Sequence, residues 1–159
     1  MSPITRAWIA FAAVGAGLVH LALAVSAPAL LAVLLAVVGI AEFGWGVMVT
    51  FDERFLAPRV AVIAVLAPIG LWIAALAFGL DVRPLPLALA TLLELFIAFA
   101  IGLSLRRARA PKPVGTARYV VGLAIAALVI AAVTAPALAA TEAGERAIDP
   151  SLFEDGTHH

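Results

Sequence analysis

Long apolar runs alternate with short polar segments along this chain. A helix that crosses a bilayer needs about 20 consecutive, mostly apolar residues, and these runs reach that length. They are apolar on every side, whereas strands of a membrane barrel would alternate apolar and polar positions. The pattern therefore predicts an all-α membrane bundle. The five expected spans are Ala7–Ala27, Ala29–Val49, Val60–Leu80, Leu85–Leu105 and Tyr119–Ala140.

Short polar segments separate the expected spans. Pro28 follows the first span, and the later breaks are TFDERFLAPR, DVRP and RRARAPKPVGTAR. Proline and clustered charges are typical of helix ends and loops. We therefore expect a five-helix transmembrane domain over residues 1–140 and a flexible, acidic tail over residues 141–159.

The composition also favours a bilayer protein. Hydrophobic residues make up 65% of the 159 residues and charged residues only 13%, whereas about 25% of a soluble domain is charged. The formal net charge is zero, so nothing in the charge favours a nucleic-acid partner. The chain has no Cys, which excludes disulfides and thiolate metal sites.

The distribution of Lys and Arg predicts the orientation of the helices. Cytoplasmic loops of membrane proteins carry an excess of these residues. Eight of the ten fall on one side of the five-span arrangement, namely Arg6, Arg54, Arg59, Arg106, Arg107, Arg109, Lys112 and Arg118. Arg83 and Arg146 fall on the other side. We expect a cytoplasmic N-terminus and an external tail. The first span also has features of a signal peptide, but its apolar run is longer than the roughly 7–15 residues of a signal-peptide core.

Two hairpins of the expected bundle share a short sequence pattern. GLVHLALAV at Gly17–Val25 and GLWIAALAF at Gly70–Phe78 are identical at five of nine positions. Glu42 and Glu94 follow these stretches at nearly the same offset. A duplicated helical hairpin with one added helix would produce this pattern, and parallel repeats occur in transporters. Chance similarity between two Ala- and Leu-rich stretches is the alternative.

Three ionisable side chains lie well inside the spans: His20, Glu42 and Glu94. Such residues cost roughly 2.5 kcal/mol or more when charged at mid-membrane, so they usually face protein or water. Small residues flank each one and indicate helix–helix contacts: Gly17 and Ala24 beside His20, Gly39 and Gly46 beside Glu42, and Ala90 and Ala98 beside Glu94.

Two interpretations fit these three residues. Counted at about 1.5 Å per residue, they lie at different depths, about 10 to 20 Å along their spans. Together with Thr91, one turn before Glu94, they would form a staggered polar pathway for protons or a cation. Alternatively, protonated carboxyls hydrogen-bond across helix contacts and only hold the bundle together.

The C-terminal tail carries a second set of metal-ligand residues. His158 and His159 follow the carboxylates Glu154 and Asp155. Imidazole and carboxylate groups suit Cu(II), Zn(II) or Ni(II). A terminal His pair is also typical of a purification tag, which would remove any native metal role.

Catalytic and nucleotide-binding motifs are absent from the sequence. There is no Walker loop, dinucleotide fingerprint or HExxH, and a serine nucleophile has no local signature. We therefore expect a protein that is not an enzyme and has no organic cofactor, with a copper or zinc ion as the candidate ligand.

The stretches GLVHLALA, AEFGWGVMV and ATLLELFIAFAIGLSLRR resemble uncharacterised small polytopic membrane proteins of high-GC Gram-positive bacteria. The resemblance covers the first four spans. It implies a location in the bacterial cytoplasmic membrane and a role for His20 and Glu94, but it supplies no reaction. Glu42 stands where many of those proteins carry Gln.

Two hypotheses for function follow from these observations. The first is a small transporter or metal-binding protein that handles a cation or protons through His20, Glu42 and Glu94. The second is an accessory subunit of a larger membrane complex, for example a respiratory one, in which these residues fix helix packing. The expected partners are bilayer lipid and either another membrane protein or further copies of this chain.

Overall fold

The computed structural model describes residues 1–51, 58–80, 83–106 and 115–147, which form six helices. They are α1 (Pro3–Ala24), α2 (Ala29–Phe51), α3 (Pro58–Ala77), α4 (Pro84–Arg106), α5 (Thr116–Ala139) and the short α6 (Glu142–Ala147). Among the described residues, five helices, α1 to α5, are long and apolar enough to cross a membrane. The predicted all-α bundle of five spans is confirmed.

Each of the five long helices differs from its predicted span by one to four residues at one end or both. Local capping explains two of these differences. α1 begins at Pro3, before the predicted Ala7, since Ser2 Oγ accepts a hydrogen bond from the Thr5 backbone N–H at 3.1 Å. Proline at the first helical position needs no such partner, because it lacks an N–H.

α3 ends at Ala77, three residues before the predicted Leu80, in a Schellman motif. Gly79 takes a positive φ of 69°. The N–H of Leu80 donates to the Ala75 carbonyl at 3.0 Å, and the N–H of Gly79 donates to the Leu76 carbonyl at the same distance. This pairing closes a helix C-terminus where glycine can adopt the left-handed conformation.

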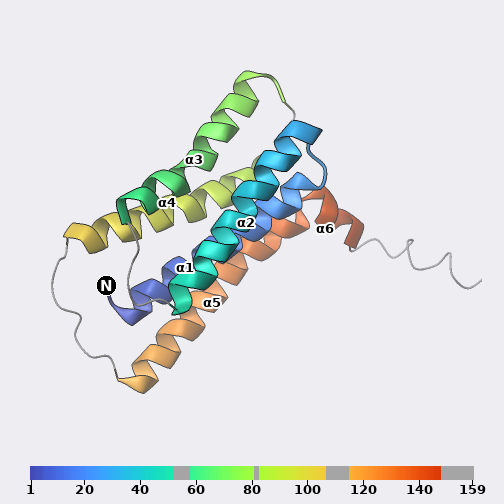
Figure 1. Cartoon of the computed structure of the whole chain (residues 1–159). Coiled ribbons are helices and arrows are strands. Elements are labelled where there is room, and N and C mark those ends of the chain that lie inside the picture. Colours follow the sequence, from blue (N-terminus) through green and yellow to red (C-terminus); the bar gives the residue numbers. More distant parts are fainter. Residues whose placement is uncertain (52–57, 81–82, 107–114, 148–159) are drawn as a thin grey trace, which may run out of the picture.

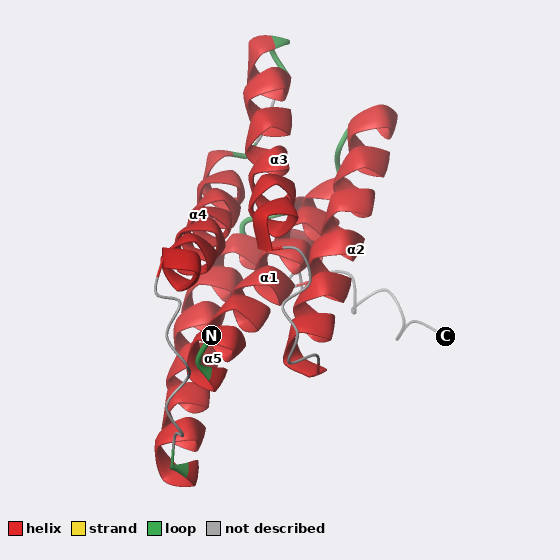
Figure 2. Ribbon diagram, turned by 60° about the vertical axis from the view of Figure 1, so that its left-hand side comes forward, coloured by secondary structure: helices red, strands yellow, loops and turns green. Residues whose placement is uncertain are grey.

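α1 occupies the middle of the bundle. It packs against α2, α4 and α5, and α3 packs against α4 (Figure 1). Figure 2 shows the same arrangement from a second side, with α3 and α4 forming one hairpin beside α1. Ala12, Ala16 and Val19 of α1 are wholly buried. Small residues on the central helix allow its neighbours to approach closely.

Glycines set the closest of these contacts, between α1 and α2. A Cβ atom placed on Gly39 would lie 2.8 Å from the carbonyl oxygen of Gly17, and one on Gly17 would lie 2.7 Å from the carbonyl oxygen of Gly39. Farther along, a Cβ on Gly46 would lie 2.8 Å from the carbonyl oxygen of Ala10. Backbone therefore meets backbone, and the longitudinal register of the two helices is fixed.

Apolar side chains cover the outside of the bundle. Leu30, Phe51 and Phe78 are more than three-quarters exposed, as expected for residues that face lipid tails. The predicted tail begins with α6, which contacts α1 and α5. Residues 148–159 of that tail lie outside the described residues.

Candidate cation site

The centre of the bundle holds a cluster of three ionisable side chains from three helices. His20 comes from α1, Glu42 from α2 and Glu94 from α4. His20 and Glu94 are completely buried, and Glu42 is 8% exposed. One potential ligand atom from each lies within 4.8 Å of the others. The sequence-based prediction that these residues face helix contacts agrees with this placement.

The imidazole of His20 lies between the two carboxylates. Its Nδ1 is 2.7 Å from Glu42 Oε2, and its Nε2 is 3.4 Å from Glu94 Oε1. An ionised carboxylate only accepts hydrogen bonds, so a proton on Nδ1 is donated to Glu42. If the imidazole is neutral, Nε2 then carries the lone pair toward Glu94. The second oxygen of Glu42, both oxygens of Glu94 and Nε2 have no hydrogen-bond partner.

The cluster is compact, whereas the sequence predicted a staggered ladder. A depth in the membrane that is counted along each helix separately assumes that all the helices begin at the same depth. The glycine contacts between α1 and α2 instead set their relative shift, which brings His20 level with Glu42. Protons or ions would therefore meet one shared site rather than three successive ones.

The charges of the cluster would not balance if both carboxylates were ionised. Two negative charges would then face one imidazole, which carries at most one positive charge. An uncompensated charge in an apolar interior is strongly disfavoured. A shared proton or a bound cation would restore the balance.

One pair of donor atoms in the cluster also has the separation expected of two ligands on a small metal ion. Zinc binds imidazole nitrogen and carboxylate oxygen at about 2.0–2.2 Å, so two tetrahedral ligands lie roughly 3.3–3.5 Å apart. The 3.4 Å between His20 Nε2 and Glu94 Oε1 matches that separation. Glu42 would then orient the ring through Nδ1, as carboxylates beside metal-bound histidines commonly do.

Trp72 of α3 covers the imidazole. Its ring and that of His20 stack with centroids 6.0 Å apart and an angle of 20° between their planes. Trp72 is 3% exposed, and its Nε1 has no hydrogen-bond partner. Sequence reasoning missed this residue, because a tryptophan inside an apolar span is ordinarily a packing residue. It also missed Thr134 of α5, which is buried against Gly15 of α1 with an unpartnered hydroxyl.

A pocket of about 230 Å³, called the vestibule here, has Trp72 among its lining residues. Ser26, Arg83 and Glu142 contribute to its lining together with the indole. It lies where α1 ends and α2 begins, the end of the bundle that the Lys and Arg distribution places outside. Trp72 is therefore the residue that lines the vestibule and contacts the cluster.

Thr91, the other predicted pathway residue, is not part of the cluster. Thr91 is half-buried on α4, and no described contact joins it to His20 or to the carboxylates. The tail residues of the predicted metal site, Glu154, Asp155, His158 and His159, lie outside the described residues.

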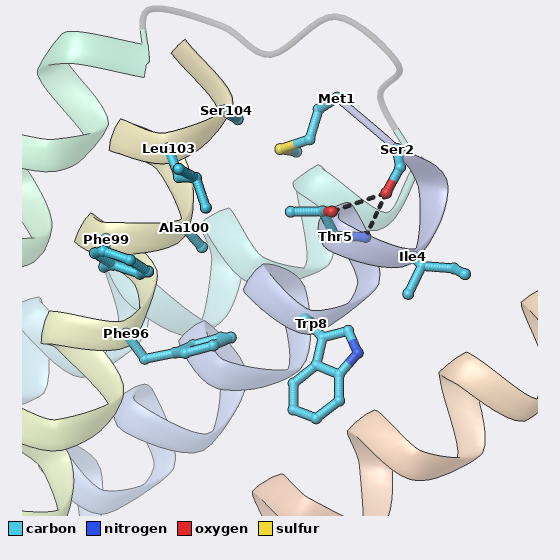
Figure 3. A pocket seen from close by; sticks show the side chains of 10 residues that line it. All are labelled: Met1, Ser2, Ile4, Thr5, Trp8, Phe96, Phe99, Ala100, Leu103 and Ser104. Carbon is cyan, nitrogen blue, oxygen red and sulfur yellow. Dashed lines mark hydrogen bonds between the residues drawn. The ribbon is translucent and has the colours of Figure 1, made fainter. Parts of the chain in front are cut away.

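A larger groove of about 530 Å³ lies near the N-terminus, between α1 and α4 (Figure 3). Trp8 and Phe96 face each other there, with ring centroids 5.9 Å apart. Ser2 and Thr5 are hydrogen-bonded to each other at 2.8 Å. No His, Asp or Glu is among its lining residues. The groove therefore lacks the donor groups that make the central cluster a candidate cation site.

No protein-family model, curated protein or solved structure matches this chain. The fold and the cluster define a multi-pass helical membrane protein with a buried imidazole–carboxylate centre. The resemblance to bacterial membrane proteins and the location in the cytoplasmic membrane stay predictions.

Proposed function

We propose that this chain is a small membrane transporter that binds a cation at the His20–Glu42–Glu94 cluster, with protons competing for the same atoms. The gathering of three ligand groups within 4.8 Å, inside a bundle of apolar helices, carries this proposal. A cluster that serves packing alone is expected to pair its buried polar atoms. Here, Nε2 of His20 and both oxygens of Glu94 have no hydrogen-bond partner, although Nε2 and Glu94 Oε1 lie 3.4 Å apart.

The surroundings of the cluster suit transport better than permanent binding. Trp72 lines the vestibule at one end of the bundle, and its indole ring also stacks on the imidazole of His20. A site that can be reached from an end of the bundle can exchange its ion. Protons and metal ions compete for such ligands, because imidazole and carboxylate bind a metal only when deprotonated.

Zn²⁺ titration of the purified protein in lipid nanodiscs tests the proposal. Calorimetry in buffers of different ionisation enthalpy would give both the affinity and the number of protons released. We expect one site, proton release on binding, and affinity at least about tenfold weaker for Glu94→Gln, as for loss of a metal ligand or its supporting group. Ser104→Ala, on the same helix outside the cluster, is the matched control and should bind like the wild type.

Flux in reconstituted vesicles then separates transport from binding. Zn²⁺ or proton movement that Glu94→Gln abolishes would support a transporter. Full binding and flux in that variant would overturn the proposal and leave the cluster as a packing element. The accessory-subunit hypothesis would then be tested by co-purification of a stable partner.

A further inference from the structure

We propose that the cation is a lipophilic amine in its protonated form, which reaches Glu42 sideways from the lipid through a cleft between α2 and α3. The inference rests on the proposed function, because it takes Glu42 as a carboxylate that exchanges its positive partner. It adds the chemical class of the substrate and its route of entry.

The cleft has a volume of about 390 Å³, within the roughly 300–1,000 Å³ of small-molecule sites. Val38, Ala41, Glu42 and Trp45 line it from α2, and apolar residues between Val60 and Val65 line it from α3. Glu42 is the charged residue among them. Ala41 and Ala64 are exposed, so the cleft reaches the lipid-facing side of the bundle.

Glu42 joins this cleft to the central cluster. One of its oxygens, Oε2, lies 2.7 Å from His20 Nδ1, while Oε1 is buried and has no hydrogen-bond partner. The side chain is more than nine-tenths buried. A buried oxygen of this kind favours a ligand that brings a hydrogen-bond donor, and a charged donor most of all.

A protonated amine with an apolar body fits this combination better than the alternatives. A lipid acyl chain would fill the apolar walls and leave Oε1 unpaired. A quaternary ammonium would supply charge without an N–H. A protonated amine supplies both, and the ring of Trp45, one turn from Glu42, can add a cation–π contact.

Two probes of matched shape test the inference: 2-naphthylmethylammonium and the neutral 2-naphthylmethanol. Binding to the full chain in nanodiscs is followed by naphthalene fluorescence, with empty nanodiscs subtracted. We expect saturable binding of the amine, about tenfold tighter than the alcohol, and loss of that difference in Glu42→Gln. Equal binding of both probes would overturn the inference and identify the cleft as a space for lipid.

Replacing either of two alanines on α3 by phenylalanine tests the route of entry. Ala64→Phe fills the cleft and should weaken amine binding about tenfold or more while Zn²⁺ still binds the cluster. Ala67→Phe, at an exposed position outside the cleft lining, should change neither. Unchanged amine binding in Ala64→Phe would overturn the route. Zn²⁺ binding without amine binding in the wild type would overturn this inference alone, whereas absence of both would also overturn the proposed function.

Discussion

Gly17 and Gly39 meet across the interface of α1 and α2 with no room for a side chain. A Cβ atom on Gly39 would lie 2.8 Å from the Gly17 carbonyl oxygen and 2.9 Å from Leu21 Cγ. His20 lies one turn from Gly17, and Glu42 lies one turn from Gly39. The distance between imidazole and carboxylate therefore depends on two residues that contribute no chemistry of their own.

Gly39→Ala is expected to separate α1 from α2 and to lower the free energy of unfolding by about 1–3 kcal/mol, the usual cost of overpacking. Gly44→Ala on the same helix is the control, because nothing lies within 4 Å of its Cβ position. That change should be neutral or stabilise the helix by up to about 1 kcal/mol. Denaturation by SDS in mixed micelles measures both. Equal stability of the two variants would contradict backbone contact at Gly39.

Substitutions of Glu94 separate its chemistry from its packing. Glu94→Gln keeps the shape and the hydrogen-bonding capacity, so its stability should match that of the wild type while Zn²⁺ binding falls. Glu94→Leu should in addition cost about 0.6–2 kcal/mol, the range for polar contacts between membrane helices. Unfolding and Zn²⁺ titration on the same samples provide the test. A Gln variant that is as unstable as the Leu variant would assign the carboxylate to packing.

The docking of α6 should depend on pH through Glu145. Arg83 forms two hydrogen bonds with this carboxylate, one of 2.9 Å, and donates a third to the Ala140 carbonyl at 3.0 Å. The hydrogen bond from Arg83 holds the pKa of Glu145 below its ordinary value of 4.5. A lowered pKa means that the ion pair is complete above pH 4.5 and is lost as the pH falls through the lowered value.

A spin label on α6 would report this release. The chain has no Cys, so Ala147→Cys provides a single labelling site. We expect the label to be restrained at neutral pH and to gain mobility in acid below pH 4.5. In Glu145→Gln it should be mobile at every pH. A label whose mobility stays constant across this range would show that the Arg83–Glu145 pair does not hold α6.

The orientation of the bundle can be tested with reporter fusions at Lys112 and after Asp155. Both positions lie outside the described residues. The Lys and Arg distribution predicts a cytoplasmic reporter at the first and an external reporter at the second. Reporters on the same side would mean that the number of crossings between them is wrong.

Much of the fold follows from the sequence because long apolar runs have one stable structure in lipid. An isolated helix satisfies its own backbone hydrogen bonds, so each span is predicted without its neighbours. His20, Glu42 and Glu94 are conspicuous for the same reason, since ionisable residues are rare in such runs. The small residues beside them correctly indicate the faces on which helices meet.

The arrangement of these residues around one another does not follow from the sequence. Rise per residue gives the position of Glu42 along α2, but the shift of α2 against α1 comes from the contact of Gly17 with Gly39. Trp72 becomes a partner of His20 only when α3 folds beside α1. Both relationships depend on packing between helices, which apolar periodicity leaves undetermined.

The backbone contact between α1 and α2 makes the two halves of the cluster mechanically unequal. His20 and Glu42 belong to a pair of helices locked by glycines, whereas Glu94 lies on the α3–α4 hairpin, and a Cβ placed on Gly102 of α4 would meet nothing within 4 Å. A small swing of that hairpin would lengthen the 3.4 Å edge from His20 to Glu94 and leave the 2.7 Å bond to Glu42 intact. In such a swing the imidazole would stay with Glu42, and only its distance to Glu94 would change.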